Sequence, residues 1–118
     1  MWSGDEAPGT RHFAAECGRR VVGCATLMFN EWQGRAAGQV RGMAVEIEYR
    51  NRGVGAQLLA GAELEAAQSR GVEVIWCNAR TPAVGFYRKQ GWETVGDEFV
   101  IDTAGPHYKM VKELRSSG

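Results

Sequence analysis

Residues 50–56 read Arg50-Asn51-Arg52-Gly53-Val54-Gly55-Ala56, and they lie where a β-rich segment gives way to a helical one. The start of a helix exposes unpaired backbone N–H groups and the positive end of the helix dipole, which together favour a bound anion. The two glycines let an anion approach the backbone closely, and the two arginines add donors that suit phosphate oxygens. The stretch therefore predicts a cradle for a phosphate or pyrophosphate group.

The same stretch has a plainer interpretation, a tight strand-to-helix turn whose arginines are solvated. The Gly-x-Gly pattern alone would favour that turn, because short glycine patterns often match by chance. The flanking arginines and the helix start favour the cradle instead. Two better-known phosphate motifs do not fit, because no Gly-Lys-Ser/Thr follows and Leu58 stands where a dinucleotide-binding fingerprint needs its third glycine.

Around this stretch the sequence predicts a mixed α/β sheet with elements in the order β-β-β-α-β-α-β-β. Two strands of a hairpin and a third strand precede the stretch, and apolar residues at helical spacing follow it until Gly71. Thr81 and the proline after it predict a capped start for the second helix. The expected strands span 11–16, 21–29, 36–45, 72–77, 92–101 and 107–112. The first expected helix begins at residue 54, and the second spans 82–90.

Composition narrows the class of protein. The 118 residues have room for one domain, so we treat 1–118 as a single domain. Fourteen basic residues balance fourteen acidic ones, so no overall field draws the chain to nucleic acid or to an anionic membrane. No apolar run could span a membrane, and no signal peptide is evident. Three cysteines, Cys17, Cys24 and Cys77, do not form an even disulfide framework. We expect a cytoplasmic protein.

Several short segments, in the right order, resemble signatures of the GNAT superfamily of acyltransferases. Residues 50–56 match its Arg/Gln-x-x-Gly-x-Gly/Ala signature, which binds the coenzyme A pyrophosphate. Residues 86–92, FYRKQGW, resemble its FYxxxGF segment with Trp92 in place of phenylalanine. Residues 105–110, GPHYKM, are similar to the GxPHxxM ending of one bacterial branch. The resemblance covers the chain from about residue 12 to residue 110.

The resemblance implies a GNAT-like core and acetyl-CoA as the acyl donor. Residues 43–45 look like the end of the family's central strand, whose backbone pairs with the pantetheine arm. Asn78, expected at the end of the fourth strand, could hydrogen-bond the pantetheine amides or equally cap its own turn. The cofactor-binding residues expected on these grounds are Met43, Val45, Arg50, Arg52, Gly53, Val54, Gly55, Ala56 and Asn78.

One feature departs from the family pattern. Members usually begin with a strand and two helices that help to wall the acceptor site, but only eleven residues precede His12 here. We therefore expect Phe13, Val22 and Leu27 to lack cover, and one sheet edge to be unpaired. Unpaired edges and large apolar surfaces invite association. We expect a homodimer in which the partner subunit supplies part of the wall.

Acetyl transfer from a thioester needs a neutral amine as nucleophile, a donor for the oxyanion and a way for the thiolate to leave. A thiol has a pKa near ~8.5 and a phenol near ~10, so a phenol can stabilise or protonate the departing sulfur. The resemblance gives Tyr87 this role, near the start of the second helix. The alternative is a core aromatic beside Phe86 and Trp92. The expected oxyanion donor is the backbone N–H of Val45 or a neighbour.

The base that deprotonates the amine is not evident. His107 could accept the proton, but a lone histidine is more often a hydrogen-bonded structural residue. Glu46 and Glu48 could relay protons, although carboxylates in loops are usually solvated. His12, His107 and the scattered cysteines lack the spacing of metal ligands, so we expect no metal site.

We therefore expect an N-acetyltransferase that transfers the acetyl group of acetyl-CoA to a primary amine by direct attack in a ternary complex. The acceptor would be a small molecule or a peptide, and the sequence has no acidic run that would suit a polycationic one. One alternative is a non-catalytic acyl-CoA-binding module that keeps the cradle. Another is a structural domain whose glycine turn binds nothing. Acetyl is the family's usual acyl group, but the chain length stays open.

Overall fold

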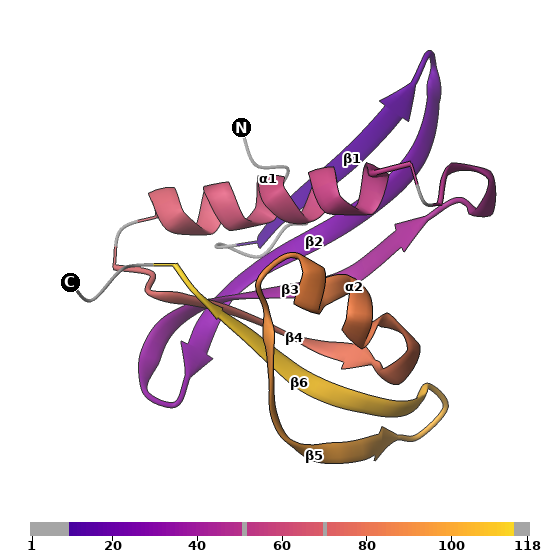
Figure 1. The fold of residues 1–118 in the computed structure, drawn as a ribbon. Coiled ribbons are helices and arrows are strands. Elements are labelled where there is room, and N and C mark those ends of the chain that lie inside the picture. Colours follow the sequence, from indigo (N-terminus) through magenta and orange to yellow (C-terminus); the bar gives the residue numbers. More distant parts are fainter. Residues whose placement is uncertain (1–9, 51, 70, 115–118) are drawn as a thin grey trace.

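The chain folds into one mixed sheet with two helices, as the sequence predicts (Figure 1). The computed structural model describes residues 10–50, 52–69 and 71–114. The predicted element order is confirmed. The strands are β1 (Thr10–Cys17), β2 (Arg20–Trp32), β3 (Arg35–Val45), β4 (Val74–Arg80), β5 (Glu93–Ile101) and β6 (Gly105–Glu113), the helices are α1 (Val54–Gln68) and α2 (Val84–Lys89), and two short 3-10 turns span Ile47–Tyr49 and Thr81–Ala83.

The six strands are arranged in the order β1-β2-β3-β4-β6-β5. All neighbours pair antiparallel except β3 and β4, which are parallel and connected through α1. Their pairing runs from Ala37 and Val74 to Val40 and Cys77. Both strands continue beyond this last pair, β3 to Val45 and β4 to Arg80. The two central strands therefore diverge at their carboxyl ends.

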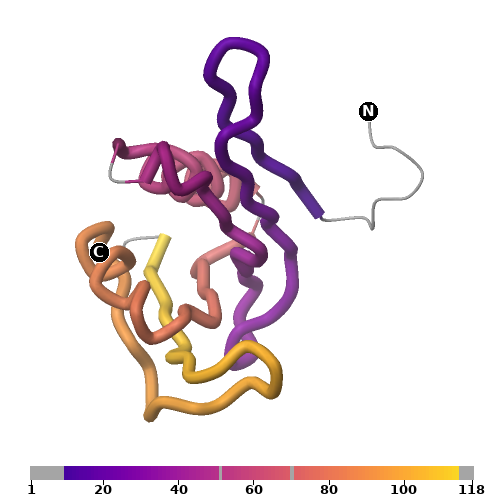
Figure 2. The backbone as a smooth tube through the Cα atoms, turned by 90° about the vertical axis from the view of Figure 1, so that its right-hand side faces the viewer, coloured from indigo at the N-terminus to yellow at the C-terminus, as the bar shows by residue number. Residues whose placement is uncertain are grey.

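Both helices lie on the same side of the curved sheet (Figure 2). They enclose one core cluster, whose fully buried members include Leu27 of β2, Leu59 of α1 and Ile75 of β4. Gly38 of β3 is required for this packing, because a Cβ at that position would lie 2.9 Å from Leu27 Cδ1 and 3.3 Å from Ala66 Cβ. Glycine is unfavourable inside a strand, yet at this position it allows α1 to approach the sheet.

The prediction that the first hairpin lacks apolar cover is wrong. Val22 and Leu27 are 2% and 0% exposed, and Phe13 packs against the core cluster. The cover comes from α1, which contacts β1, β2 and β3. The helix that shields these side chains therefore comes later in the chain than the strands it covers.

Trp92 is buried at a position where the resemblance expects phenylalanine. Its indole Nε1 donates to Glu63 Oε2 of α1 at 3.0 Å, and Lys112 Nζ of β6 donates to the other carboxylate oxygen at 2.7 Å. The indole is 2% exposed. Because a buried carboxylate needs partners, the larger, polar ring fits this site better than phenylalanine would.

Thr81 does not cap a helix, which corrects the sequence-based expectation. The turn at Thr81–Ala83 has Arg80 as its N-cap, with no side-chain cap bond. The Thr81 hydroxyl instead donates to the Glu98 carboxylate of β5 at 2.7 Å.

Neither α1 nor α2, the helices of the described residues, is long and apolar enough to cross a membrane.

Candidate functional site

The glycine turn at the start of α1 has the geometry that the sequence predicts. Gly53 is the N-cap residue with a φ of +83°, a left-handed conformation that glycine adopts without strain. Gln57 N–H donates to Gly53 O at 3.0 Å. The three preceding N–H groups, of residues 54–56, therefore have no partner within the helix. They form the positive end of a helix of 15 residues.

A cleft of about 580 Å³ opens in front of this helix start. We call it the α1 cleft. It lies between the end of β3, the first turn of α1 and α2. Its lining residues are Met43, Ala44, Val45, Arg50, Gly53, Gly55, Ala56, Arg80, Ala83, Phe86, Tyr87 and Gln90. The structure thus brings six of the nine predicted cofactor-binding residues to one cavity, together with the predicted catalytic residue Tyr87.

The other three predicted residues lie elsewhere. The Arg52 guanidinium lies 5.5 Å from the centre of the Tyr49 ring, on the exposed surface. Val54 packs its side chain toward Gly23 of β2, where a Cβ would lie 3.0 Å from Val54 Cγ1. Asn78 lines a different cavity, described below. Of these three residues, only Val54 belongs to the helix start, and it contributes through its backbone N–H group.

Two details define the walls of the α1 cleft. Arg50 Nε donates to the carbonyl of Val45 at 3.1 Å, so this arginine also holds the end of β3 against the turn. A Cβ at position 55 would lie 3.4 Å from Phe86 Cζ, so glycine leaves open the space between α1 and α2. A side chain there would occupy the approach to the helix start.

Tyr87 is both a core aromatic and a cavity residue. It is 7% exposed and packs at 5.2 Å from the Phe86 ring and 5.3 Å from the Trp92 ring, measured between centroids. It is the fourth residue of α2 rather than near its start. Burial, reinforced by the neighbouring Cys77, raises the pKa of Tyr87 well above its usual value. The phenol therefore stays protonated and can act as a donor.

The hydroxyl of Tyr87 is hydrogen-bonded to the thiol of Cys77 in β4. Burial raises the pKa of Cys77 to about 12, and the bond from Tyr87 offsets part of that rise. The thiol is therefore neutral at physiological pH and not a nucleophile.

A second cavity, of about 450 Å³, lies where β3 and β4 diverge. We call it the strand groove, because it is lined mostly by residues of β3 and β4. It shares Met43, Arg80, Ala83 and Tyr87 with the α1 cleft, so the two cavities adjoin at Tyr87. Its lining residues are Gln39, Val40, Arg41, Gly42, Met43, Asn78, Ala79, Arg80, Ala83, Tyr87, Ile101, Ala104 and His107.

Asn78 lies inside β4, which continues to Arg80, and not at the strand's end. Its side chain does not cap a turn, so that alternative is wrong. Asn78 Oδ1 accepts a hydrogen bond from Lys109 Nζ of β6 at 3.1 Å. The amide is therefore held toward the strand groove by a neighbouring strand.

His107 has a structural bond and also lines the strand groove. The residue is 5% exposed, and Nδ1 donates to the carbonyl of Gly105 at 2.8 Å. In the neutral ring this bond leaves the lone pair on Nε2. Glu46 and Glu48 line neither cavity and face Arg20, with which Glu46 forms a close ion pair. Nothing places these two carboxylates near Tyr87.

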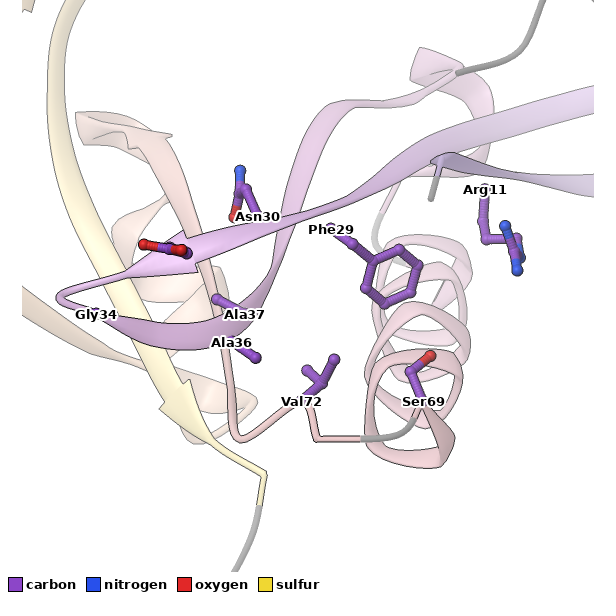
Figure 3. A pocket seen from close by; sticks show the side chains of 9 residues that line it. Arg11, Phe29, Asn30, Gly34, Ala36, Ala37, Ser69 and Val72 are labelled. Carbon is purple, nitrogen blue, oxygen red and sulfur yellow. The ribbon is translucent and has the colours of Figure 1, made fainter. Parts of the chain in front are cut away.

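A third hollow, of about 630 Å³, lies at the far end of α1 and holds none of the predicted site residues (Figure 3). Phe29, Ala36 and Val72 are among its lining residues. We call it the distal hollow. Within the described ranges 10–50, 52–69 and 71–114, no three His, Cys, Asp or Glu residues are grouped to hold a metal ion.

The sequence of the chain matches a known protein family. A family model described as "Acetyltransferase (GNAT) domain" matches residues 8–94. The chain belongs to the GNAT acetyltransferase family. The matched residues of this GNAT domain include the whole α1 cleft, whereas β6 and His107 lie beyond them.

Two Bacillus subtilis proteins illustrate the relationship of this GNAT chain to curated sequences. The uncharacterized N-acetyltransferase YitI is 43% identical over 82 residues, which cover 70% of this chain and 54% of YitI. The uncharacterized N-acetyltransferase YjcF is 27% identical over 104 residues, covering 88% of this chain and 71% of YjcF. The chain thus spans about half the length of YitI.

Solved GNAT structures share the fold. An aminoglycoside 6′-N-acetyltransferase complexed with coenzyme A superimposes with a TM-score of 0.77 at 19% identity, over 94% of this chain and 76% of that one. The ribosomal-protein-S18-alanine N-acetyltransferase of Escherichia coli gives a TM-score of 0.73 at 18% identity, over 96% and 74% of the two chains. At these identities the likeness shows the fold alone.

Proposed function

We propose that this chain is a single acyl-CoA-binding domain that transfers the acetyl group of acetyl-CoA to a primary amine. One observation carries the proposal. The α1 cleft joins a helix start with three unpaired N–H groups to a buried, protonated phenol, and it opens there into a second cavity. Family membership supports the same activity.

The residues of the α1 cleft fit coenzyme A. Glycine at position 55 leaves the space in front of the helix start open, and this space suits a pyrophosphate. The backbone of residues 53–56 would hold the pyrophosphate, with Arg50, which lines the cleft, as an additional donor. The backbone from Met43 to Val45 would hold the pantetheine arm. When bound, acetyl-CoA supplies an activated thioester.

The chemistry falls to the residues at the junction of the two cavities. As the neutral amine nitrogen bonds to the carbonyl carbon, it loses a proton, the carbon–sulfur bond breaks and the leaving sulfur gains a proton. Tyr87 is suited to donate a hydrogen bond or a proton there, because burial keeps its phenol protonated. We assign the oxyanion to the backbone N–H of Val45 or a neighbour. The strand groove is the side from which the amine would approach.

Thiol release from acetyl-CoA tests this proposal. The experiment combines a panel of small and peptide amines with a calorimetric titration of coenzyme A on the same preparation. We expect coenzyme A binding and amine-dependent thiol release. Binding without turnover for any amine would favour the non-catalytic module instead. No binding at all would favour the purely structural domain.

We also propose a homodimer and a cytoplasmic location. Among the described strands, β1 forms one edge of the sheet and pairs with β2 alone, which supports edge-to-edge association. Cys17, Cys24 and Cys77 are all free thiols, as in proteins of reducing compartments. Light scattering across a dilution series tests the dimer. A monomer mass at every micromolar concentration would contradict it.

A further inference from the structure

We propose that the acceptor amine carries a carboxylate, and that Arg41 and Arg80 in the strand groove recognise it. The inference rests on the proposed acetyl transfer and names its substrate class. A small amino acid or a similar amine with a nearby carboxylate fits this description. The position, the charge and the partners of the residues that line the groove support this substrate class.

The strand groove lies next to the proposed site of acetyl transfer. The strand groove adjoins the α1 cleft through Tyr87 and Met43, so a molecule in the groove lies beside the phenol that faces the reaction. Arg41 is in β3 and Arg80 ends β4, and these two strands border the groove where they diverge. The two guanidinium groups thus come from both sides of the opening, and a carboxylate between them would leave its amine near Tyr87.

The charged side chains that line the strand groove are cationic. Among the described residues, the lining of the strand groove includes Arg41, Arg80 and His107 and no aspartate or glutamate. Within the described part of the chain, ion pairs join other cations to carboxylates, and neither groove arginine takes part in one. Arg41 Nη1 lies 3.4 Å from Met28 Sδ, which is a weak acceptor. Both guanidinium groups therefore keep donors for an anionic ligand.

Lys109 does not line the groove but contacts Asn78, which does. Its Nζ donates to Asn78 Oδ1 and lies 5.1 Å from the centre of the Trp76 ring and 5.2 Å from that of Phe99. Glu98 is nearby in β5, but its carboxylate accepts the Thr81 hydroxyl and does not line the groove. A polycationic acceptor would meet like charges here, whereas a carboxylate would meet opposite ones.

Arg41 distinguishes this inference from a role in cofactor binding. Arg80 lines both cavities and could serve a phosphate of coenzyme A, but Arg41 lines the strand groove alone. Arg41 is exposed, so replacing it with glutamine removes the charge without disturbing the core. Arg19, exposed in the turn between β1 and β2 and in neither cavity, provides a control with the same change of charge.

The test compares acids with their neutral amides by NMR titration of the ¹⁵N-labelled chain. The probes are the pairs glycine and glycinamide, 4-aminobutyrate and 4-aminobutanamide, and phenylalanine and phenylalaninamide, each with and without coenzyme A. We expect at least one acid to bind about tenfold more tightly than its amide, as for a charge-assisted hydrogen bond. Arg41→Gln should abolish that preference, and Arg19→Gln should keep it.

Two results would overturn the inference: acids and amides that bind equally in every pair, or a preference that survives Arg41→Gln. The proposed function fails separately, if coenzyme A causes no shifts at the α1 cleft. A carboxylate preference that depends on Arg41 supports the inference with or without coenzyme A, because binding in the groove is measured independently of turnover.

Discussion

The α1 cleft and the strand groove adjoin at Tyr87 but are built in different ways. The part of the α1 cleft that we propose binds an anion is one short run of chain, and its donors are mainly backbone N–H groups at the start of a helix. The strand groove is assembled mostly from residues of β3 and β4, with Ile101 of β5 and His107 of β6, and these strands are far apart in sequence. A site made from consecutive backbone groups carries a local signature, whereas a site made by topology does not. Four predictions test the α1 cleft, its junction with the strand groove and the scaffold around them.

The largest effect is expected at the helix start. Gly55→Asp places a carboxylate and a Cβ in front of the unpaired N–H groups, against Phe86. Steric overlap and like-charge repulsion with a pyrophosphate should weaken coenzyme A binding by about 100-fold or more, roughly 3 kcal/mol. Calorimetry on the folded variant measures this affinity.

Gly18→Asp is the matched control for the helix-start variant. Gly18 lies in the β1–β2 turn with open space around it, and aspartate tolerates its left-handed backbone. Coenzyme A affinity should not change in this control. If Gly55→Asp also kept full affinity, the α1 cleft would not be the cofactor site.

The second prediction concerns the junction of the cavities. Tyr87→Phe removes the buried donor but keeps the ring contacts with Phe86 and Trp92. We expect kcat to fall by about 100-fold, typical of losing a positioned acid, while coenzyme A affinity changes by less than about twofold. Tyr108→Phe, in neither cavity, is the control. Full turnover in Tyr87→Phe would return Tyr87 to a packing role.

How much of the fold and of the candidate site the sequence predicts depends on the range of each interaction. The glycine turn, α1 and the element order follow from local patterns, because neighbouring residues determine them. Two predictions failed because a distant partner decides the outcome: α1 covers Leu27, and Glu98 takes the Thr81 hydroxyl. The charge of the strand groove was missed for the same reason. Arg41 and Arg80 line one groove only because β3 and β4 are adjacent.

The third prediction tests the scaffold outside both cavities. Trp92→Phe removes the hydrogen bond to Glu63 and leaves Lys112 as the remaining partner of that largely buried carboxylate. We expect the free energy of unfolding to fall by about 1–3 kcal/mol, as when a buried polar group loses a bond. Chemical denaturation measures it. Coenzyme A affinity should stay the same, and a large loss of affinity would show that Trp92 also shapes the cleft.

The smallest effect is a pH dependence at the junction. The pKa of Cys77 is raised from 9.0 to about 12 in the folded chain, so folding favours the neutral thiol. Its contribution to stability is complete below pH 9 and is lost as the pH rises toward 12. Between pH 9 and 10 the unfolding free energy should fall by about 1 kcal/mol. Cys77→Ala should flatten this slope, and Cys24→Ala, at an exposed thiol, should not.

We propose that coenzyme A binds at the start of α1 through the backbone. The most direct test is an NMR titration of the ¹⁵N-labelled chain with coenzyme A, following the amide signals residue by residue. We predict the largest shifts at Gly53, Gly55 and Ala56 and at Val45, with little change around the distal hollow (Figure 3). Shifts centred on Phe29 and Val72 in that hollow, or no shifts at all, would contradict the claim.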